Sequence, residues 1–250
     1  MGIFLLFITF VFQLNAYVLG DDPPFETNIV GGQIADIEDY PYQVAVIQDE
    51  RLWCGGSIAN PNYVLTAGHC VFMAIMPLFV HAGSRYWYNP GSVHEVDFNI
   101  TYTTEISTTG DVALLHVSKT FNYDKTCQPI PLFGSYEKPQ VGALAYVTGW
   151  GITDNGNIAE QLHQITTRII DQNTCNNIYK DTIIGNLHPG EICANADRMG
   201  PCRGDSGSPM IIDGRLAGLV SMGIGCLYPK YPAIYVDVGY FRDWIITNMK

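Results

Sequence analysis

Short runs of apolar and β-branched residues recur along the chain, and glycine, proline, asparagine and aspartate separate them. The clearest runs are Tyr42–Gln48, Tyr63–Thr66, Asp111–Val117, Ala143–Thr148, Ile165–Ile170, Pro209–Ile212, Leu216–Ser221 and Ala233–Val238. Short strands at close intervals, bounded by turn residues, are typical of an antiparallel barrel or sandwich. The pattern therefore predicts an all-β fold.

One segment has the 3.6-residue period of an amphipathic helix instead. Near Tyr240–Met249, the side chains of Phe241, Trp244 and Ile245 fall on one face. The sequence therefore predicts a C-terminal helix. A domain seam is predicted near Pro129–Pro139, between two strand-rich halves.

The first twenty residues form a separate segment, because they contain no charged side chain. Ile3–Phe12 is almost continuously apolar, and the small residue Gly20 stands where a signal peptidase would cut. The apolar core is too short to span a bilayer comfortably, so a membrane anchor is the less favoured alternative. We therefore expect residues 1–20 to be a signal peptide and the protein to be secreted and extracellular.

The composition is that of a globular protein, with 47% hydrophobic and 15% charged residues. The formal charge is −11, and Asp21, Asp22 and Glu26 carry three of these charges, which leaves −8 for residues 29–250. An acidic surface argues against nucleic acid or an anionic membrane as a partner. It favours solubility and does not identify a substrate.

Three short strings contain the groups that peptide hydrolysis requires. His69 lies in Thr-Ala-Gly-His-Cys, Asp111 begins Asp-Val-Ala-Leu-Leu, and Ser206 lies in Gly-Asp-Ser-Gly-Ser-Pro. A serine hydroxyl becomes a useful nucleophile when a histidine accepts its proton. A buried carboxylate then fixes the imidazole tautomer and stabilises the imidazolium. These residues are therefore candidates for nucleophile, base and orienting group.

The order of the three residues discriminates between folds. In an α/β-hydrolase the serine comes first and the histidine last, on a G-x-S-x-G turn. Here Ser208 breaks that pattern, and no histidine follows His188. The order His, Asp, Ser therefore excludes an α/β-hydrolase.

With Ile-Val-Gly-Gly at residues 29–32 and Thr-Gly-Trp-Gly at 148–151, these strings resemble the chymotrypsin–trypsin family of serine proteases. The resemblance covers residues 29–250, which would form the protease domain. It implies two six-stranded antiparallel β-barrels with the active site between them, and a serine endopeptidase that acts through an acyl-enzyme without a cofactor. A non-catalytic secreted binding protein on the same fold is the alternative, although such relatives usually lack a triad member.

The resemblance also assigns roles to single residues. His69 and Asp111 would come from the first barrel and Ser206 from the second. The backbone N–H groups of Gly204 and Ser206 would form the oxyanion hole, where glycine avoids interference from a Cβ atom. Ser221 would hydrogen-bond the triad aspartate and pair with the substrate through its backbone.

By the same resemblance, residues 21–28 would be an activation propeptide. Cleavage before Ile29 would create an ammonium group that folds in and pairs with Asp205. A buried ion pair with one partner missing costs roughly 3–5 kcal/mol, so the precursor would leave its pocket unformed. Asn28 stands where relatives carry arginine or lysine, which suggests an asparagine-specific activating protease.

Seven cysteines in a secreted chain indicate disulfides. The resemblance implies the pairs Cys54–Cys70, Cys175–Cys193 and Cys202–Cys226. Cys127 is then left over, either as a buried free thiol or as an intermolecular link.

By resemblance, the substrate pocket has Gly200 and Pro201 at its floor, Gly223 and Ala233 in its walls, and Met222 in place of the usual tryptophan. A trypsin-like enzyme has aspartate at the position of Gly200. A cationic side chain would be desolvated here without a counter-charge. The pocket therefore predicts cleavage after Phe, Tyr, Leu or Met.

An elastase-like preference is the alternative, since Pro201 or residues 227–231 could narrow the pocket. Arg203 at the rim could favour acidic flanking residues.

The remaining signals are weaker. The other histidines, His81, His94, His116, His163 and His188, show no ligand-like spacing, and residues 83–91 lack carboxylates, so we expect no metal. Asn99 begins a glycosylation acceptor pattern, Asn-Ile-Thr. The expected partners are protein or peptide substrates, an activating protease and protein inhibitors, and we expect a monomer.

Overall fold

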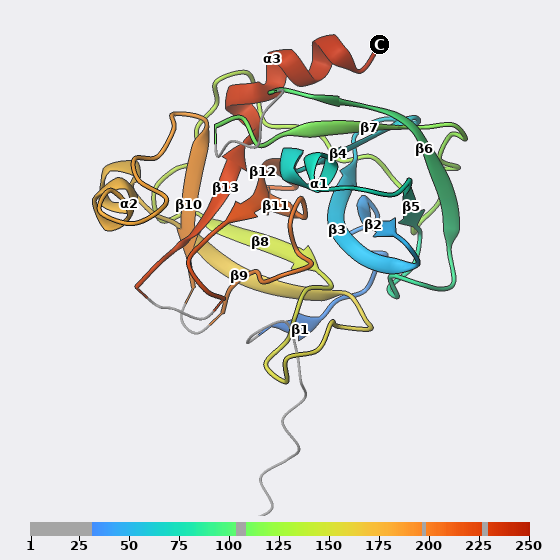
Figure 1. The fold of residues 1–250 in the computed structure, drawn as a ribbon, viewed down its shortest axis with the longest axis horizontal. Coiled ribbons are helices and arrows are strands. Elements are labelled where there is room, and N and C mark those ends of the chain that lie inside the picture. The colour runs from blue at the N-terminus through green and yellow to red at the C-terminus, as the bar shows by residue number, and fades with distance from the viewer. Residues whose placement is uncertain (1–31, 104–108, 197–198, 227–229) are drawn as a thin grey trace, which may run out of the picture.

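In the computed structural model, which describes residues 32–103, 109–196, 199–226 and 230–250, two antiparallel β-barrels lie side by side with a helix at the C-terminal end (Figure 1). This confirms the predicted fold class. The expected signal peptide, the propeptide and Ile29 lie outside the described residues. None of the helices in the described parts of the chain is long and apolar enough to cross a membrane.

The first barrel closes in the order β2-β3-β4-β7-β6-β5. Its strands are β2 (Gln43–Gln48), β3 (Arg51–Ile58), β4 (Tyr63–Thr66), β5 (Leu78–Ala82), β6 (Ser92–Thr101) and β7 (Ala113–Val117). Asp49 and Glu50 both have positive φ between β2 and β3, as a two-residue hairpin turn requires. Inside the barrel, Val44, Val46, Val64 and Val80 are completely buried.

The second barrel contains β8 (Leu144–Gly149), β9 (His163–Ile169), β10 (Glu191–Asn195), β11 (Pro209–Ile212), β12 (Arg215–Met222) and β13 (Ala233–Asp237). The order is β9-β10-β13-β12-β11-β8, and pairing of β8 with β9 closes it. The short strand β1 (Gln33–Ile34) pairs with β9. Asp213 and Gly214 form the hairpin between β11 and β12 with positive φ at both positions.

The predicted C-terminal helix is α3 (Val238–Asn248), which begins slightly earlier than expected. It begins there because the Asp237 carboxylate accepts a hydrogen bond from the backbone N–H of Tyr240, which caps the helix. Phe241 and Ile245 are buried and Trp244 packs beside them, as predicted. The helix therefore covers the apolar junction of the barrels.

Two helices were not predicted. The first, α1 (Gly68–Phe72), is a short turn between β4 and β5. The second, α2 (Gln172–Tyr179), is short and mostly polar, and its apolar face consists of one set at i, i+3 and i+4, formed by Cys175, Ile178 and Tyr179. Asp171 caps α2 by accepting a hydrogen bond from the Thr174 backbone N–H at 2.8 Å.

The barrels share one apolar cluster. Leu65 and Leu114 from the first barrel pack in the same cluster as Leu219 and Val236 from the second and Phe241 of α3. Full burial of each such side chain contributes about 1.5–3 kcal/mol, so the barrels are held in a fixed arrangement. Residues 118–143 connect β7 to β8, and the predicted seam near 129–139 stays a prediction.

Candidate active site

His69 lies on α1. Figure 1 shows α1 at the junction of the two barrels. Its Nδ1 lies 2.8 Å from Asp111 Oδ2, and its backbone N–H donates to Asp111 Oδ1 at 2.7 Å. A carboxylate can only accept, so Nδ1 carries the proton in this pair. The other ring nitrogen, Nε2, is left as a base.

Asp111 precedes β7 and is buried, with 5% of its surface exposed. Ser221 from β12 of the second barrel donates its hydroxyl to Asp111 Oδ2 at 2.5 Å. Gly68 leaves room for this carboxylate, since a Cβ there would lie 3.2 Å from Asp111 Oδ1. The carboxylate is therefore fixed by both barrels, and its orientation fixes the imidazole.

Ser206 lies in the loop before β11. Its carbonyl oxygen accepts a hydrogen bond from the Gly55 N–H at 2.8 Å and lies 3.8 Å from Cys70 Sγ, beside His69. Gly204 and Gly207 flank it with φ of +97° and +77°. A side chain would be strained at both positions, which is a physical reason for glycine in this string.

Asp205 points away from solvent, with 1% of its surface exposed. Its carboxylate accepts hydrogen bonds from the N–H groups of Gly151 at 2.7 Å and Cys202 at 2.9 Å. Burial raises the pKa of Asp205 to about 7, although these hydrogen bonds oppose the shift. A Cβ at Gly149 or Gly151 would lie 2.2 Å from its oxygens, so the glycines of the Thr-Gly-Trp-Gly string make room for this carboxylate.

A pocket of about 430 Å³ opens beside Ser206. All the predicted pocket residues line it: Gly200, Pro201, Ser221, Met222, Gly223 and Ala233. Arg203 also lines it, and no aspartate or glutamate occurs among the described lining residues. A Cβ at Gly200 would lie 2.8 Å from the Cys226 carbonyl oxygen, so glycine keeps the floor open.

Tyr231 also lines the pocket, as the last residue of the segment that, from the sequence, could narrow it, whereas Thr167 and Tyr235 were not predicted. The hydroxyl of Tyr235 is buried without a hydrogen-bond partner among the described residues. Tyr235 lies in the predicted strand 233–238, but a strand pattern does not say which inward side chain reaches a pocket.

Glu191 is a second group that the sequence did not single out. It is buried in β10, where one carboxylate oxygen accepts from the His188 N–H at 2.7 Å. The other oxygen has no partner among the described residues. Burial raises the pKa of Glu191 to about 7. Its charge is therefore poorly compensated above that pH.

The three expected disulfides are present, as Cys54–Cys70, Cys175–Cys193 and Cys202–Cys226. The first links β3 to α1 next to His69. Cys127 is buried as a free thiol, and burial raises its pKa to about 11, which keeps it unreactive. Cys54, His69 and Cys70 lie close enough to hold a metal ion, but both thiols are consumed by the disulfide.

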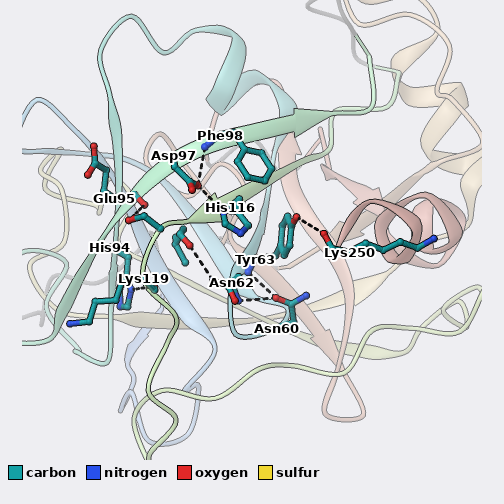
Figure 2. Close-up of polar contacts among 12 residues, drawn as sticks. Asn60, Asn62, Tyr63, His94, Glu95, Asp97, Phe98, His116, Lys119 and Lys250 are labelled. Carbon is teal, nitrogen blue, oxygen red and sulfur yellow. Dashed lines mark hydrogen bonds and ion pairs between the residues drawn. The ribbon is translucent and has the colours of Figure 1, made fainter.

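The first barrel contains a second histidine–carboxylate pair, between His116 of β7 and Asp97 of β6 (Figure 2). His116 Nδ1 lies 2.6 Å from Asp97 Oδ1. Phe98 stacks on the imidazole at 4.3 Å between ring centroids, and Tyr63 meets it edge-on at 4.9 Å. The pair links two neighbouring strands, and the expectation that His116 is not a metal ligand stays a prediction.

Comparisons with known proteins identify the family of this chain. The sequence model of the Trypsin family matches residues 29–245. Hypodermin-A of Hypoderma lineatum is 36% identical over 93% of this chain and 94% of its own length. Trypsin of Phaedon cochleariae is 35% identical over 89% of this chain and 90% of its own length.

Among solved structures, neuropsin, a serine protease expressed in the limbic system of mouse brain, superposes with a TM-score of 0.80. It is 28% identical, and the match covers 88% of this chain and 99% of neuropsin. Because the family model and the relatives cover most of the sequence, this chain belongs to the trypsin family of serine proteases and is a serine endopeptidase.

Proposed function

We propose that Ser206, His69 and Asp111 carry out peptide hydrolysis through an acyl-enzyme. The hydroxyl oxygen of Ser206 attacks the carbonyl carbon while His69 Nε2 takes its proton. His69 then gives that proton to the leaving amine. In the second half of the reaction a water molecule attacks the acyl-enzyme while His69 Nε2 takes its proton, and the acid is released as Ser206 recovers a proton from His69. The observation that carries this proposal is the Asp111 carboxylate, which Ser221 and two N–H groups of His69 hold in one orientation.

The tetrahedral intermediate needs donors for its negative oxygen. We assign this role to the backbone N–H groups of Gly204 and Ser206, as the family resemblance implies. The positive φ of Gly204 supports the assignment, because the peptide can turn there without a Cβ. The Gly55 N–H bond to the Ser206 carbonyl supports it further by fixing the loop.

The pocket supports cleavage after a large apolar residue. Its described lining offers no carboxylate to a lysine or arginine side chain, and Gly200, Gly223 and Ala233 leave it open. Relatives named trypsin favour a second candidate, cleavage after basic residues. Gly200 argues against it, because glycine offers no counter-charge at this position of the floor.

A panel of peptides that differ only in the residue before the cut tests this specificity. We expect kcat/KM for Phe, Tyr or Leu to exceed that for Lys by about 100-fold, because an apolar side chain gains burial and a cation is desolvated unpaired. A preference for Lys or Arg would support the trypsin-like alternative. A preference for Ala or Val would support the elastase-like one.

We also propose that the protein is secreted as a monomeric zymogen, with residues 21–28 removed by another protease. The buried Asp205 carboxylate supports this, because burial raises its pKa and a cation beside it would stabilise the charged form. An ammonium group at Ile29 would supply that cation and order the neighbouring Gly204.

Disulfides suit an extracellular setting, where protein inhibitors would also act. Asn99 is exposed on β6, where a glycan would reach solvent.

The nature of the activator is testable on the purified precursor. We expect an asparagine-specific endopeptidase to release Ile29 as the new N-terminus and trypsin to leave this bond intact, because Asn28 precedes it. N-terminal sequencing and the rise of activity measure the result. An Asn28→Lys precursor is the control, and we expect trypsin to activate it. Clean release of Ile29 by trypsin from the unmodified precursor would reject the asparagine-specific activator.

A further inference from the structure

Glu191 points into the apolar junction that the two barrels share. In the register of the second barrel, Glu191 of β10 lies opposite Val236 of β13, and Val236 lies opposite Leu219 of β12. Residues directly opposite one another in an antiparallel sheet project from the same face. Val236 and Leu219 pack with Val112 in the shared apolar cluster. The Glu191 side chain therefore faces the first barrel and not the interior of the second.

The C-terminal helix separates this carboxyl group from solvent. A Cβ atom on the preceding residue, Gly190, would lie 2.6 Å from the Phe241 ring and 2.9 Å from the Tyr240 ring, so α3 packs directly on this part of β10. Tyr102 of the first barrel meets Phe241 edge-on at 4.8 Å between ring centroids. Glu191 is 4% exposed, and its Oε1 has no hydrogen-bond partner among the described residues. In such a medium a charge acts on other charges more strongly than it would in water.

Asp111 lies at the same junction, one residue before Val112 of the shared cluster. Its partner Ser221 lies on β12, which also carries Leu219. Burial is the main cause of the raised pKa of Glu191, the hydrogen bond from the backbone opposes the shift, and the charge of Asp111 adds to it. The two carboxylates therefore interact electrostatically through the junction.

The other titratable groups around Glu191 do not neutralise its charge. Asp237 of β13 pairs with Lys138 at 2.7 Å. His188 accepts a hydrogen bond from the Gly190 N–H through Nδ1 at 3.0 Å, as a neutral imidazole does, and burial and the charge of Lys138 lower its pKa. Tyr240 of α3 meets the His188 ring edge-on. An ionised Glu191 therefore keeps its full negative charge at the junction.

We propose that Glu191 is a positioning residue for catalysis, whose carboxylate adds a second negative charge near Asp111 and stabilises the imidazolium that His69 forms when it takes the nucleophile's proton. The inference rests on the proposed function and adds a group from β10 to it. Because the imidazolium forms as the enzyme approaches the transition state, the extra charge raises kcat/KM. A carboxyl group contributes charge only above its pKa, which is about 7 here, so the contribution of Glu191 should appear as the pH rises through that value.

Glu191→Gln tests this on the activated enzyme, because it removes the charge and keeps the shape of the side chain. The measurement is kcat/KM on one peptide with Phe before the cut, from about pH 5.5 to about pH 8.5. We expect the ratio of unmodified enzyme to variant to be near one at the acid end, where Glu191 is protonated. It should rise to about threefold at the alkaline end, with its midpoint near pH 7.

Glu191→Met is a second variant that places no unpaired amide in the apolar junction, and it should give the same rise. The control is Glu95→Gln, since Glu95 is exposed on β6 and water and salt screen its charge. Its ratio should stay near one at every pH. A ratio that does not change with pH in the Glu191 variants would mean that the residue acts only through structure, and would overturn this inference alone. Failure of the unmodified activated enzyme to cleave the peptide would overturn the proposed function as well.

Discussion

Replacing Ser206 with alanine is expected to lower kcat by about 10⁶-fold, because it removes the atom that forms the acyl-enzyme. The fold should survive. The contacts recorded for Ser206 with Gly55 and Cys70 use its backbone carbonyl, which alanine keeps. Peptide hydrolysis measures the loss, and thermal unfolding measures stability. Mass spectrometry after fluorophosphonate treatment should find the label on Ser206 in the activated enzyme and none in the variant.

Ser208→Ala is the matched control, two residues away in the same string. Ser208 is completely buried, and its hydroxyl has no partner among the described residues. Removing an unsatisfied hydroxyl leaves no new unpaired group, so activity and stability should stay near those of the unmodified enzyme. If Ser206→Ala kept substantial activity, or if the activated enzyme resisted the label, a binding protein on this fold would become the better explanation.

Many of the strands can be predicted from the pattern of apolar and polar residues within a short stretch of sequence. Tyr63–Thr66 and Pro209–Ile212 are strands with the predicted bounds, because turn residues flank uniformly buried runs. By contrast, β6 was not predicted. Val96, Phe98 and Ile100 do alternate with Asp97 and Asn99, but most of the side chains of β6 are exposed or half-buried and the strand has no continuous apolar run. Its pairing with β5 and β7 completes the barrel.

The proposed site likewise combines features that a short stretch of sequence predicts with contacts that only the folded chain makes. The strings around His69, Asp111 and Ser206 are local, and the structure brings His69 and Asp111 into contact across 42 residues. Contacts between distant segments have no such string. Leu52 of β3 and Ile158 each place a methyl carbon 3.3 Å from where a Cβ on Gly204 would be, and no single stretch of sequence reveals this.

Nor does a histidine–carboxylate contact identify a catalytic pair by itself. His116 and Asp97 reproduce the Nδ1–Oδ contact at 2.6 Å, but they lie on adjacent strands, where His116 pairs with Phe98 and the register shifts at Asp97. The pair of His69 and Asp111 differs in its surroundings. A buried carboxylate, a second-barrel hydroxyl from Ser221 and a neighbouring pocket converge on it.

Asp111→Asn is therefore expected to lower kcat by about 10⁴-fold near neutral pH while leaving KM much less changed. An asparagine side-chain amide turned toward His69 Nδ1 donates a proton where the carboxylate accepted one. The imidazole then carries its own proton on Nε2 and cannot accept that of Ser206. The kinetic constants are measured on peptide substrates at concentrations fixed by active-site titration.

Asp97→Asn makes the same chemical change in the pair that Figure 2 shows, on the face formed by β6 and β7. It breaks a solvent-exposed contact between two strands, so it should change stability little and leave kcat within about twofold. A comparable loss of kcat in both variants would mean that the change acts through general disturbance of the first barrel. A loss below tenfold in Asp111→Asn would show that His69 does not depend on this carboxylate for its tautomer, and the proposed triad would fail.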